Sequence, residues 1–157
     1  NEVDLESFLL SEATNQTQSA VTNLIPTLLT LKKNDFVLGV ATNDAESAAI
    51  AHLKKADIYK YFDFLAGYDS GFGSKPGPGQ ISAFCTKMKL KPNEVVMIGD
   101  STHDLVASLS AGTIPIGVLT GPATKSELES YSSTILNSIT DLVDLFELKV
   151  TSNAENL

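Results

Sequence analysis

The sequence predicts an α/β protein built on a doubly wound parallel sheet. Short apolar runs at 36–41, 95–99 and 114–119 lack the polar alternation of half-exposed strands, so each is expected to be a strand buried on both faces. Helical patterns follow the runs, and strands that alternate with helices through right-handed crossovers form a parallel sheet. Polar residues stand where the runs end, at the carboxyl edge where open α/β sheets bind ligands.

The composition indicates one globular domain. The chain has 157 residues, 43% of them apolar, which is enough for one domain with a core. Its net charge is −8, from 11 basic and 19 acidic residues, and this balance argues against a nucleic acid or an anionic membrane as partner. No apolar run is long enough to cross a bilayer. The single Cys85 lies in an apolar helical pattern and cannot form an internal disulfide, which fits a reducing, cytoplasmic compartment.

The N-terminal part of the chain has the weakest pattern. A short helix is expected over residues 4–13, and the segment 14–22 is polar. A clearer helix is expected to begin at Asn23 and to end near Lys33. Pro26 would lie in its first turn, where a missing N–H costs little.

The middle of the chain is predicted to alternate regularly. The strand over 36–41 ends at Thr42, and Asn43 or Asp44 is expected to cap the helix that follows. A third strand is centred on 64–66. The loop after it, 67–79, is the longest Gly/Pro-rich segment of the chain, and function concentrates in such loops.

The second half continues the alternation. The pattern predicts a helix over 80–89, the strand over 95–99, a helix ending at Gly112, the strand over 114–119, a short acidic helix over 124–131, an edge strand over 134–136 and a last helix from Thr140 or Asp141 through Leu148.

Asp100 and Asp104 lie on either side of the turn after the strand 95–99. Both carboxylates are therefore expected at the mouth of a crevice. Two carboxylates in one place repel each other unless a cation or a lysine lies between them, and hard oxygen ligands suit Mg²⁺. A plainer interpretation stays open, in which Asp104 caps the helix and Asp100 is a solvated loop acid.

Thr42 and Lys75 add the elements of a phosphate site at the same edge. A hydroxyl beside backbone N–H groups at a helix N-terminus can cradle a phosphate, and a lysine there neutralises its charge. With Mg²⁺ on the two aspartates, such a site offsets charge on a transferring phosphoryl group. Alone, a threonine after a strand is an ordinary cap and a loop lysine is ordinarily solvated, so the prediction depends on their order and placement.

These motifs resemble those of the haloacid dehalogenase (HAD) superfamily of phosphohydrolases. Val40-Ala41-Thr42-Asn43 is similar to its second motif, Ser74-Lys75-Pro76-Gly77-Pro78 to its third, and Gly99-Asp100-Ser101-Thr102-His103-Asp104 to its fourth. The segments 67–69 and 117–121 are closest to the phosphoglycolate phosphatase-like branch. The resemblance covers residues 23–148 and is carried by three motifs in order.

The resemblance implies a Rossmann-like HAD core and a Mg²⁺-dependent phosphatase. Such an enzyme would act on a small phosphorylated metabolite through an aspartyl-phosphate intermediate. Thr42 and Asn43 would hold the phosphoryl oxygens, and Lys75 would bridge phosphate and nucleophile. Asp100 would bind Mg²⁺ and Asp104 would support it. The alternatives are a phosphosugar mutase of the same fold and a non-catalytic domain that binds phosphate or Mg²⁺.

The chain departs from the family at the first motif, a strand ending Asp-x-Asp-Gly-Thr that supplies the nucleophile and the acid/base. Asp4 and Glu6 form only a degenerate echo of it, with three residues before them, too few for the buried strand expected between those ending at Thr42 and Asp100. We therefore expect that the chain lacks an N-terminal part of a longer protein and is inactive as given. Residues 1–22 would be a remnant of the family's helical cap or a poorly ordered segment, residues 23–150 the core domain, and residues 151–157 a frayed tail.

Overall fold

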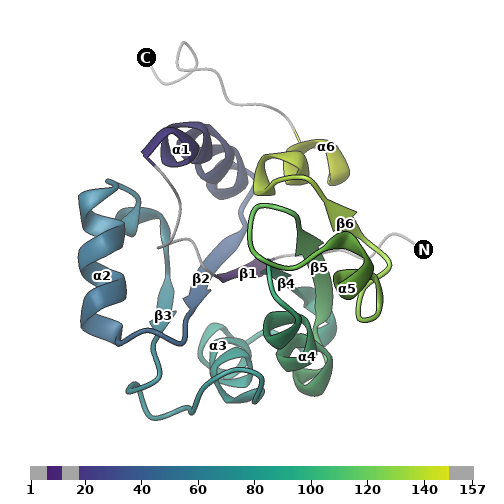
Figure 1. Cartoon of the computed structure of the whole chain (residues 1–157). Coiled ribbons are helices and arrows are strands. Elements are labelled where there is room, and N and C mark those ends of the chain that lie inside the picture. Colours follow the sequence, from purple (N-terminus) through teal and green to yellow (C-terminus); the bar gives the residue numbers. More distant parts are fainter. Residues whose placement is uncertain (1–6, 12–17, 149–157) are drawn as a thin grey trace.

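The computed structural model describes residues 7–11 and 18–148, and side-chain burial from residue 24 onward (Figure 1). The strands are β1 (Ser7–Ser11), β2 (Val37–Ala41), β3 (Phe64–Ala66), β4 (Val95–Gly99), β5 (Ile114–Val118) and β6 (Ile135–Leu136). The α-helices are α1 (Gln18–Lys33), α2 (Glu46–Lys55), α3 (Gly79–Met88), α4 (Thr102–Ala111), α5 (Lys125–Glu129) and α6 (Leu142–Leu145). Short 3₁₀ helices lie at Tyr59–Tyr61, Pro92–Glu94 and Ile139–Asp141.

The strands form one six-stranded sheet in the order β3-β2-β1-β4-β5-β6, and every neighbouring pair is parallel. In the register of β1, Ser11 lies beside Ala41 of β2 and Leu10 lies beside Ile98 of β4. The chain winds outward in both directions from the β1–β4 pair, and open α/β sheets bind ligands at this switch point. The predicted doubly wound parallel sheet is confirmed.

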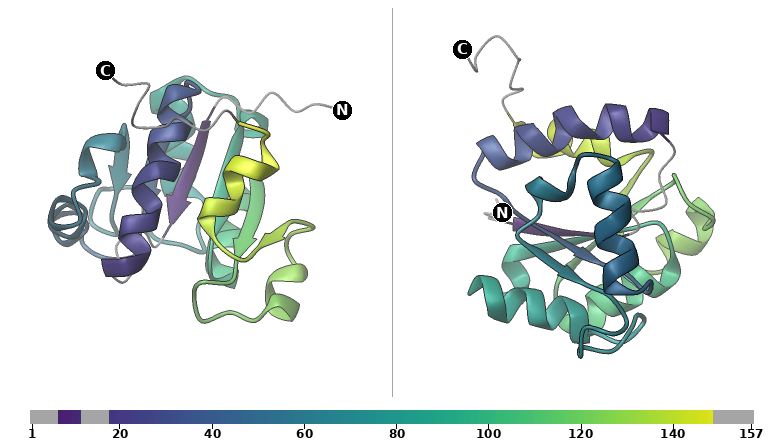
Figure 2. Two further views of the ribbon diagram at one scale, coloured as in Figure 1. Left: turned by 90° about the horizontal axis from the view of Figure 1, so that it is seen from above. Right: turned by 90° about the vertical axis from the view of Figure 1, so that its left-hand side faces the viewer.

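Helices cover both faces of the sheet and make a three-layer molecule (Figure 2). One apolar cluster joins side chains of α1, α2 and α6 to the sheet, and the other joins α3 and α4 to it. The alternation within β4 shows how one strand serves both layers. Val96 and Ile98 belong to the first cluster, whereas Val95 and Met97 belong to the second. All four are fully buried, which explains why the strand is a continuous apolar run.

The interpretation of the N-terminal segment is wrong for Ser7–Ser11. These residues form β1, not part of a helix over 4–13, and β1 occupies the central position between β2 and β4 that we expected to be missing. A short apolar run can form a strand or a helical turn by its local pattern alone. Here, pairing with a strand on each side decides the outcome. The sheet therefore includes Ser7–Ser11. Residues 1–6, 12–17 and 149–157 lie outside the described part, and the predicted domain bounds stay a prediction.

Two predicted helix starts are also corrected. α1 begins at Gln18, so Pro26 lies inside the helix rather than in its first turn. The proline is on the exposed side, while Leu28 and Leu31 on the other side are fully buried, and this packing outweighs the loss of one backbone hydrogen bond. In α2 the N-cap residue is Ala45, which has no side-chain cap, so neither Asn43 nor Asp44 caps it as predicted.

None of the described helices combines the length and the hydropathy needed to span a membrane.

Candidate active site

The predicted site residues come from three loops at the carboxyl edge of the sheet. Thr42 follows β2 and Asp100 follows β4, on either side of the central strand β1. Lys75 lies in the loop between β3 and α3. Its amine reaches back over β2, because Lys75 Nζ donates a hydrogen bond to the carbonyl oxygen of Ala41 at 2.8 Å. The topology thus brings together residues that are far apart in the sequence.

Lys75 is part of a buried ion pair. Its Nζ lies 2.6 Å from Asp104 Oδ1, and each side chain is 1% exposed. Because an isolated buried charge is very unfavourable, each of these groups depends on the other. The interpretation of Lys75 as a solvated loop residue is therefore excluded. Its peptide bond to Pro76 is cis.

Asp104 uses both carboxylate oxygens within the described structure. While Oδ1 binds Lys75, Oδ2 accepts hydrogen bonds from the backbone N–H and the hydroxyl of Ser101 at 3.2 and 3.0 Å. In return the Ser101 hydroxyl accepts from the Asp104 N–H, which completes a capping box at the start of α4. Gly99 makes this arrangement sterically feasible, since a Cβ there would lie 2.2 Å from the Asp104 Cβ. Asp104 therefore holds in place the turn that follows Asp100.

Asp100 is packed against the loop that follows β5. A Cβ on Gly121 would lie 2.1 Å from Asp100 Oδ2, so the glycine leaves the space in which this carboxylate sits. A hard carboxylate oxygen at the end of β4 fits a Mg²⁺ ligand. Among the residues that the structure describes, no group of three or more His, Cys, Asp or Glu side chains could hold a metal. Mg²⁺ commonly binds through one or two carboxylates and retains several waters, and Asp100 fits that donor set.

Thr42 and Asn43 have different roles in the turn after β2. The Thr42 hydroxyl accepts the backbone N–H of Asp44 at 3.0 Å, which leaves its own hydrogen to be directed at an acceptor such as a phosphoryl oxygen. The Asn43 side chain binds the backbone of Lys75. Its amide donates to the Lys75 carbonyl at 2.9 Å and accepts the Lys75 N–H at 2.8 Å. Asn43 therefore holds the Lys75 backbone, and phosphate binding by this residue would have to use its backbone N–H.

Three contributors to the site were not predicted from the sequence: the Asn43–Lys75 contact, the space that Gly121 provides for Asp100, and Gln80. Gln80 is fully buried in the first turn of α3 and donates to the Thr42 carbonyl at 2.9 Å. The contacts of Asn43 and Gln80 join residues that are 32 and 38 positions apart in the sequence, so no local pattern predicts these contacts. The only available signal for Gln80 was a polar residue in the otherwise apolar inward positions of the helix 80–89.

The weak nucleophile candidates Asp4 and Glu6 lie outside the described residues. Both precede β1 in the sequence, whereas the site residues follow their strands. The residue directly after β1 in the sequence is Glu12, where the family resemblance implies an aspartate. Glu12 also lies outside the described part of the chain.

One side chain in α3 and one in α5 have shifted pKa values. Burial raises the pKa of the Cys85 thiol, so this cysteine in α3 is a core residue with little thiolate, not a nucleophile. The pKa of Glu127 is lowered, chiefly because its carboxylate accepts the backbone N–H and then the hydroxyl of Thr124. This contact is a second capping box, at the start of α5.

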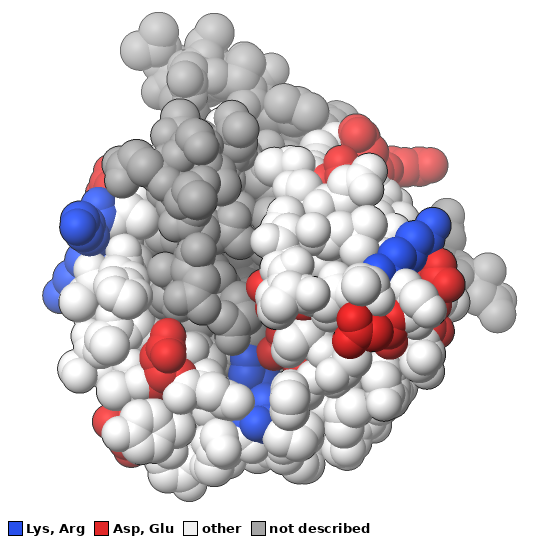
Figure 3. All heavy atoms as spheres, in the orientation of Figure 1, with Lys and Arg blue, Asp and Glu red and all other residues white. Residues whose placement is uncertain are grey.

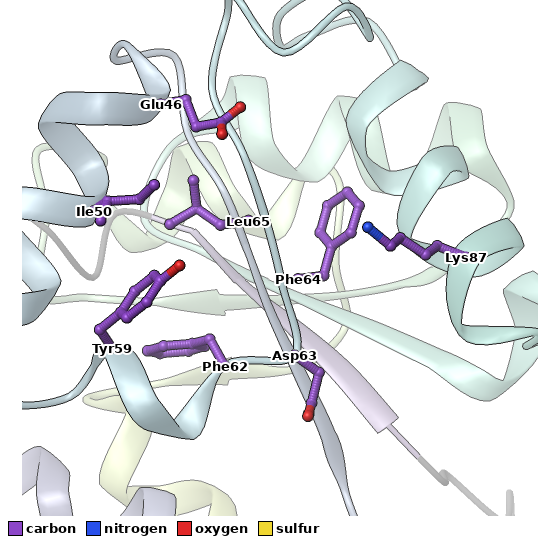
Figure 4. A pocket seen from close by; sticks show the side chains of 8 residues that line it. All are labelled: Glu46, Ile50, Tyr59, Phe62, Asp63, Phe64, Leu65 and Lys87. Carbon is purple, nitrogen blue, oxygen red and sulfur yellow. The ribbon is translucent and has the colours of Figure 1, made fainter.

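Surface features do not point to another site. On the face shown in Figure 3, acidic and basic side chains are scattered among uncharged ones, and the described residues there form no continuous basic patch. A cavity of about 210 Å³ lies over β3, lined by residues that include Ile50, Tyr59, Phe64 and Lys87 (Figure 4). None of the predicted site residues lines it.

Comparisons with known proteins identify the same family as the sequence motifs. The sequence profile of the haloacid dehalogenase-like hydrolases matches residues 5–118. A phosphoglycolate phosphatase from Mannheimia succiniciproducens is 32% identical over 115 residues, which are 73% of this chain and 51% of that protein. The pyrophosphatase PpaX from Bacillus mycoides is 28% identical over 120 residues, 76% of this chain and 56% of that protein.

The fold is also similar to that of solved structures. A crystal structure of a predicted phosphoglycolate phosphatase from Haemophilus somnus has a TM-score of 0.73 at 27% identity, covering 78% of this chain and 55% of that one. The chain spans about half the length of the curated relatives it matches.

Proposed function

Because this chain belongs to the haloacid dehalogenase-like hydrolase family, we propose that it forms the phosphate-binding core of a Mg²⁺-dependent phosphatase. The observation that carries the proposal is the buried ion pair of Lys75 and Asp104 at the carboxyl edge, anchored to the carbonyl next to Thr42. Burying a lysine side chain is energetically unfavourable. A Lys75 ammonium held close to Thr42 and to the turn after Asp100 is suited to an anionic ligand.

The described residues would act mainly by electrostatic preorganisation. The Thr42 hydroxyl would donate to a phosphoryl oxygen, and the backbone N–H of Asn43 would add a second donor. The Lys75 ammonium would offset part of the phosphoryl charge. Because Asp104 and the Ala41 carbonyl already hold this ammonium, little reorganisation would be needed on binding.

Asp100 would hold the metal, with Asp104 supporting the turn that carries it. Bound Mg²⁺ supplies charge stabilisation for a transferring phosphoryl group. The absence of a side chain at Gly121 leaves room for the Asp100 carboxylate beside the loop after β5.

We further propose that the 157-residue chain is catalytically inert. Covalent phosphoryl transfer needs a carboxylate nucleophile at the end of the strand between those of Thr42 and Asp100. β1 occupies that position, and the resemblance implies an aspartate directly after it, whereas the sequence has Glu12. Glutamate carries its carboxylate one methylene farther from the backbone, and near-attack geometry tolerates errors of about 1 Å poorly.

The substrate class is proposed from the relatives that the chain resembles. Those relatives are named as phosphatases for phosphoglycolate and for pyrophosphate, both small phosphorylated compounds. Because this chain spans only about half of their length, we propose the class of small phosphorylated metabolites and no single member.

Binding of inorganic phosphate tests the phosphate site independently of catalysis. Isothermal titration with Mg²⁺ present should detect binding by the natural chain, and Thr42→Ala should weaken it by about 1.5–3 kcal/mol, the usual value of one hydrogen bond to a charged group. Asp100→Asn should remove the Mg²⁺ dependence of that binding. Ser82→Ala, an exposed change on α3, is the matched control. Phosphate binding that none of these changes alters would contradict the proposal.

Activity assays distinguish the remaining alternatives. We expect no turnover of p-nitrophenyl phosphate, phosphoglycolate or pyrophosphate by the natural chain. Robust turnover that Asp4→Asn abolishes would overturn this expectation and place the nucleophile at Asp4. Turnover gained in Glu12→Asp would support the phosphatase core, whereas continued inactivity with intact phosphate binding would favour the non-catalytic alternative. Phosphate transfer between two sugar-phosphate forms, without release, would indicate the mutase.

A further inference from the structure

Gln80 links the two loops that carry Thr42 and Lys75. It is the second residue of α3 and is 0% exposed. Its Nε2 donates to the carbonyl oxygen of Thr42 at 2.9 Å and to that of Gly73 at 3.0 Å. One side chain from a helix thus joins the end of β2 to the loop segment two residues before Lys75.

The other half of the Gln80 amide is unsatisfied. Its Oε1 is buried and has no hydrogen-bond partner among the described residues. The opposite orientation of the amide is worse, because an oxygen would then face the Thr42 and Gly73 carbonyls, which are both acceptors. The two Nε2 hydrogen bonds therefore determine the orientation of the side chain, and Oε1 is left without a partner.

A buried amide whose oxygen has no hydrogen bond is not explained by stability alone. A buried polar atom without a partner opposes folding, so the unpaired Oε1 carries a cost that the two Nε2 hydrogen bonds have to offset. The neighbouring positions of α3 follow the apolar rule, since Ile81 and Phe84 are fully buried core residues. Violations of this rule tend to occur where function requires a particular geometry.

We propose that Gln80 is a positioning residue, which holds the Lys75 loop against the end of β2 so that Lys75 and Thr42 face one ligand. This inference rests on the phosphate site proposed above. Gln80 complements Asn43, which binds the Lys75 backbone directly from the β2 side. Asn43 fixes the position of the Lys75 backbone, and Gln80 fixes the loop segment that precedes Lys75.

Hydrogen exchange measures this role without requiring activity. The variants are Gln80→Met and Gln80→Leu, which keep the approximate volume and remove both donors, with Ser82→Ala as control. The probes are the amides of Lys75, bonded to Asn43, and Gly77, bonded to the Ser74 carbonyl. The reference is the amide of Thr113, bonded to the Ser108 carbonyl in the other half of the molecule. Titration with inorganic phosphate in the presence of Mg²⁺ is the second readout.

We expect about tenfold faster exchange at Lys75 and Gly77 in both Gln80 variants, and phosphate binding weaker by about tenfold or more. Exchange at Thr113 and the thermal midpoint should stay close to those of the natural chain. Unchanged exchange at Lys75 and Gly77 would overturn the proposal. Loss of the folded state in both variants, or equal acceleration at Thr113, would also overturn it, because Gln80 would then be required for the whole core.

The two proposals fail in different ways. If the natural chain does not bind phosphate but the Gln80 variants still accelerate exchange at Lys75 and Gly77 alone, the proposed function fails and the positioning of the loop stands. If the natural chain binds phosphate and the variants leave both exchange and affinity unchanged, the proposed function stands and the role of Gln80 is refuted.

Discussion

The two halves of the candidate site are held together by different kinds of contact. The Asp100 half is organised locally, by a capping box between Ser101 and Asp104. The Thr42–Lys75 half is organised by side-chain amides that reach across more than 30 residues, from Asn43 and from Gln80. The Lys75–Asp104 ion pair joins the halves. Local contacts can form with their own helix, whereas the long-range ones exist only once the sheet is assembled.

This difference orders the effects that substitutions should have. A change at the ion pair affects both halves and should cost the most. A change in the local half should cost what a packed turn or a helix cap contributes. A change in the long-range half should loosen one loop more than it lowers the stability of the fold.

Lys75→Met should have the largest effect. It leaves the Asp104 carboxylate buried without its cation, and breaking a buried pair in this way typically lowers the free energy of unfolding by about 3–5 kcal/mol. Urea denaturation gives the value. Lys125→Met is the control, because its pair with Glu129 is exposed on both sides and should contribute about 0.5 kcal/mol or less.

The double variant Lys75→Met with Asp104→Leu sharpens the comparison. Removing both charges avoids the unpaired carboxylate, so it should recover part of the stability lost in the single variant. A single variant that loses less than about 1 kcal/mol would show that the pair does not join the two halves energetically.

Gly99→Ala should have the next largest effect. The new Cβ would lie 2.2 Å from the Asp104 Cβ, which is the base of a side chain fixed at both oxygens and therefore cannot swing away. Overpacking of this kind usually costs about 1–3 kcal/mol. Ser110→Ala, on the exposed side of α4, should change stability by about 0.5 kcal/mol or less. If the two variants unfold at the same urea concentration, the close approach does not constrain the turn.

The same division between local and long-range contacts explains what the sequence could predict. β4 could be predicted because a strand that is buried on both faces has apolar residues at consecutive positions of the sequence. The Asp104 cap was one of two interpretations that its position after Gly99-Asp100 allowed. β1 was missed because its identity depends on pairing with β2 and β4, which bring together residues 30 and more positions apart.

The partners of the candidate site residues followed the same rule. The motifs predicted that Thr42, Lys75 and Asp100 belong to one edge of the sheet. They did not predict that the Asn43 amide binds the Lys75 backbone, because an asparagine after a strand is also a common helix cap. They also did not show that Gly121 lies against Asp100, since a Gly-Pro pair after a strand marks a turn whatever it contacts.

Ser101→Ala and Asn43→Ala compare the two kinds of contact directly, at the smallest expected effect. Ser101→Ala removes a helix N-cap, which should lower the free energy of unfolding by about 1 kcal/mol and act on the molecule as a whole, because α4 packs on β4 and β5 at the centre of the fold. Asn43→Ala removes two bonds to the Lys75 backbone, so the amide of Lys75 should exchange about tenfold faster, while amides in α4 keep rates that reflect global unfolding alone. Native-state hydrogen exchange on both variants, with urea denaturation alongside, gives the two quantities. If Asn43→Ala slowed or left unchanged the exchange at Lys75 while lowering global stability as much as Ser101→Ala, the long-range half would be as integral to folding as the local one. The distinction between the locally organised turn that carries Asp100 and the Lys75 loop held by long-range contacts would then have no energetic basis.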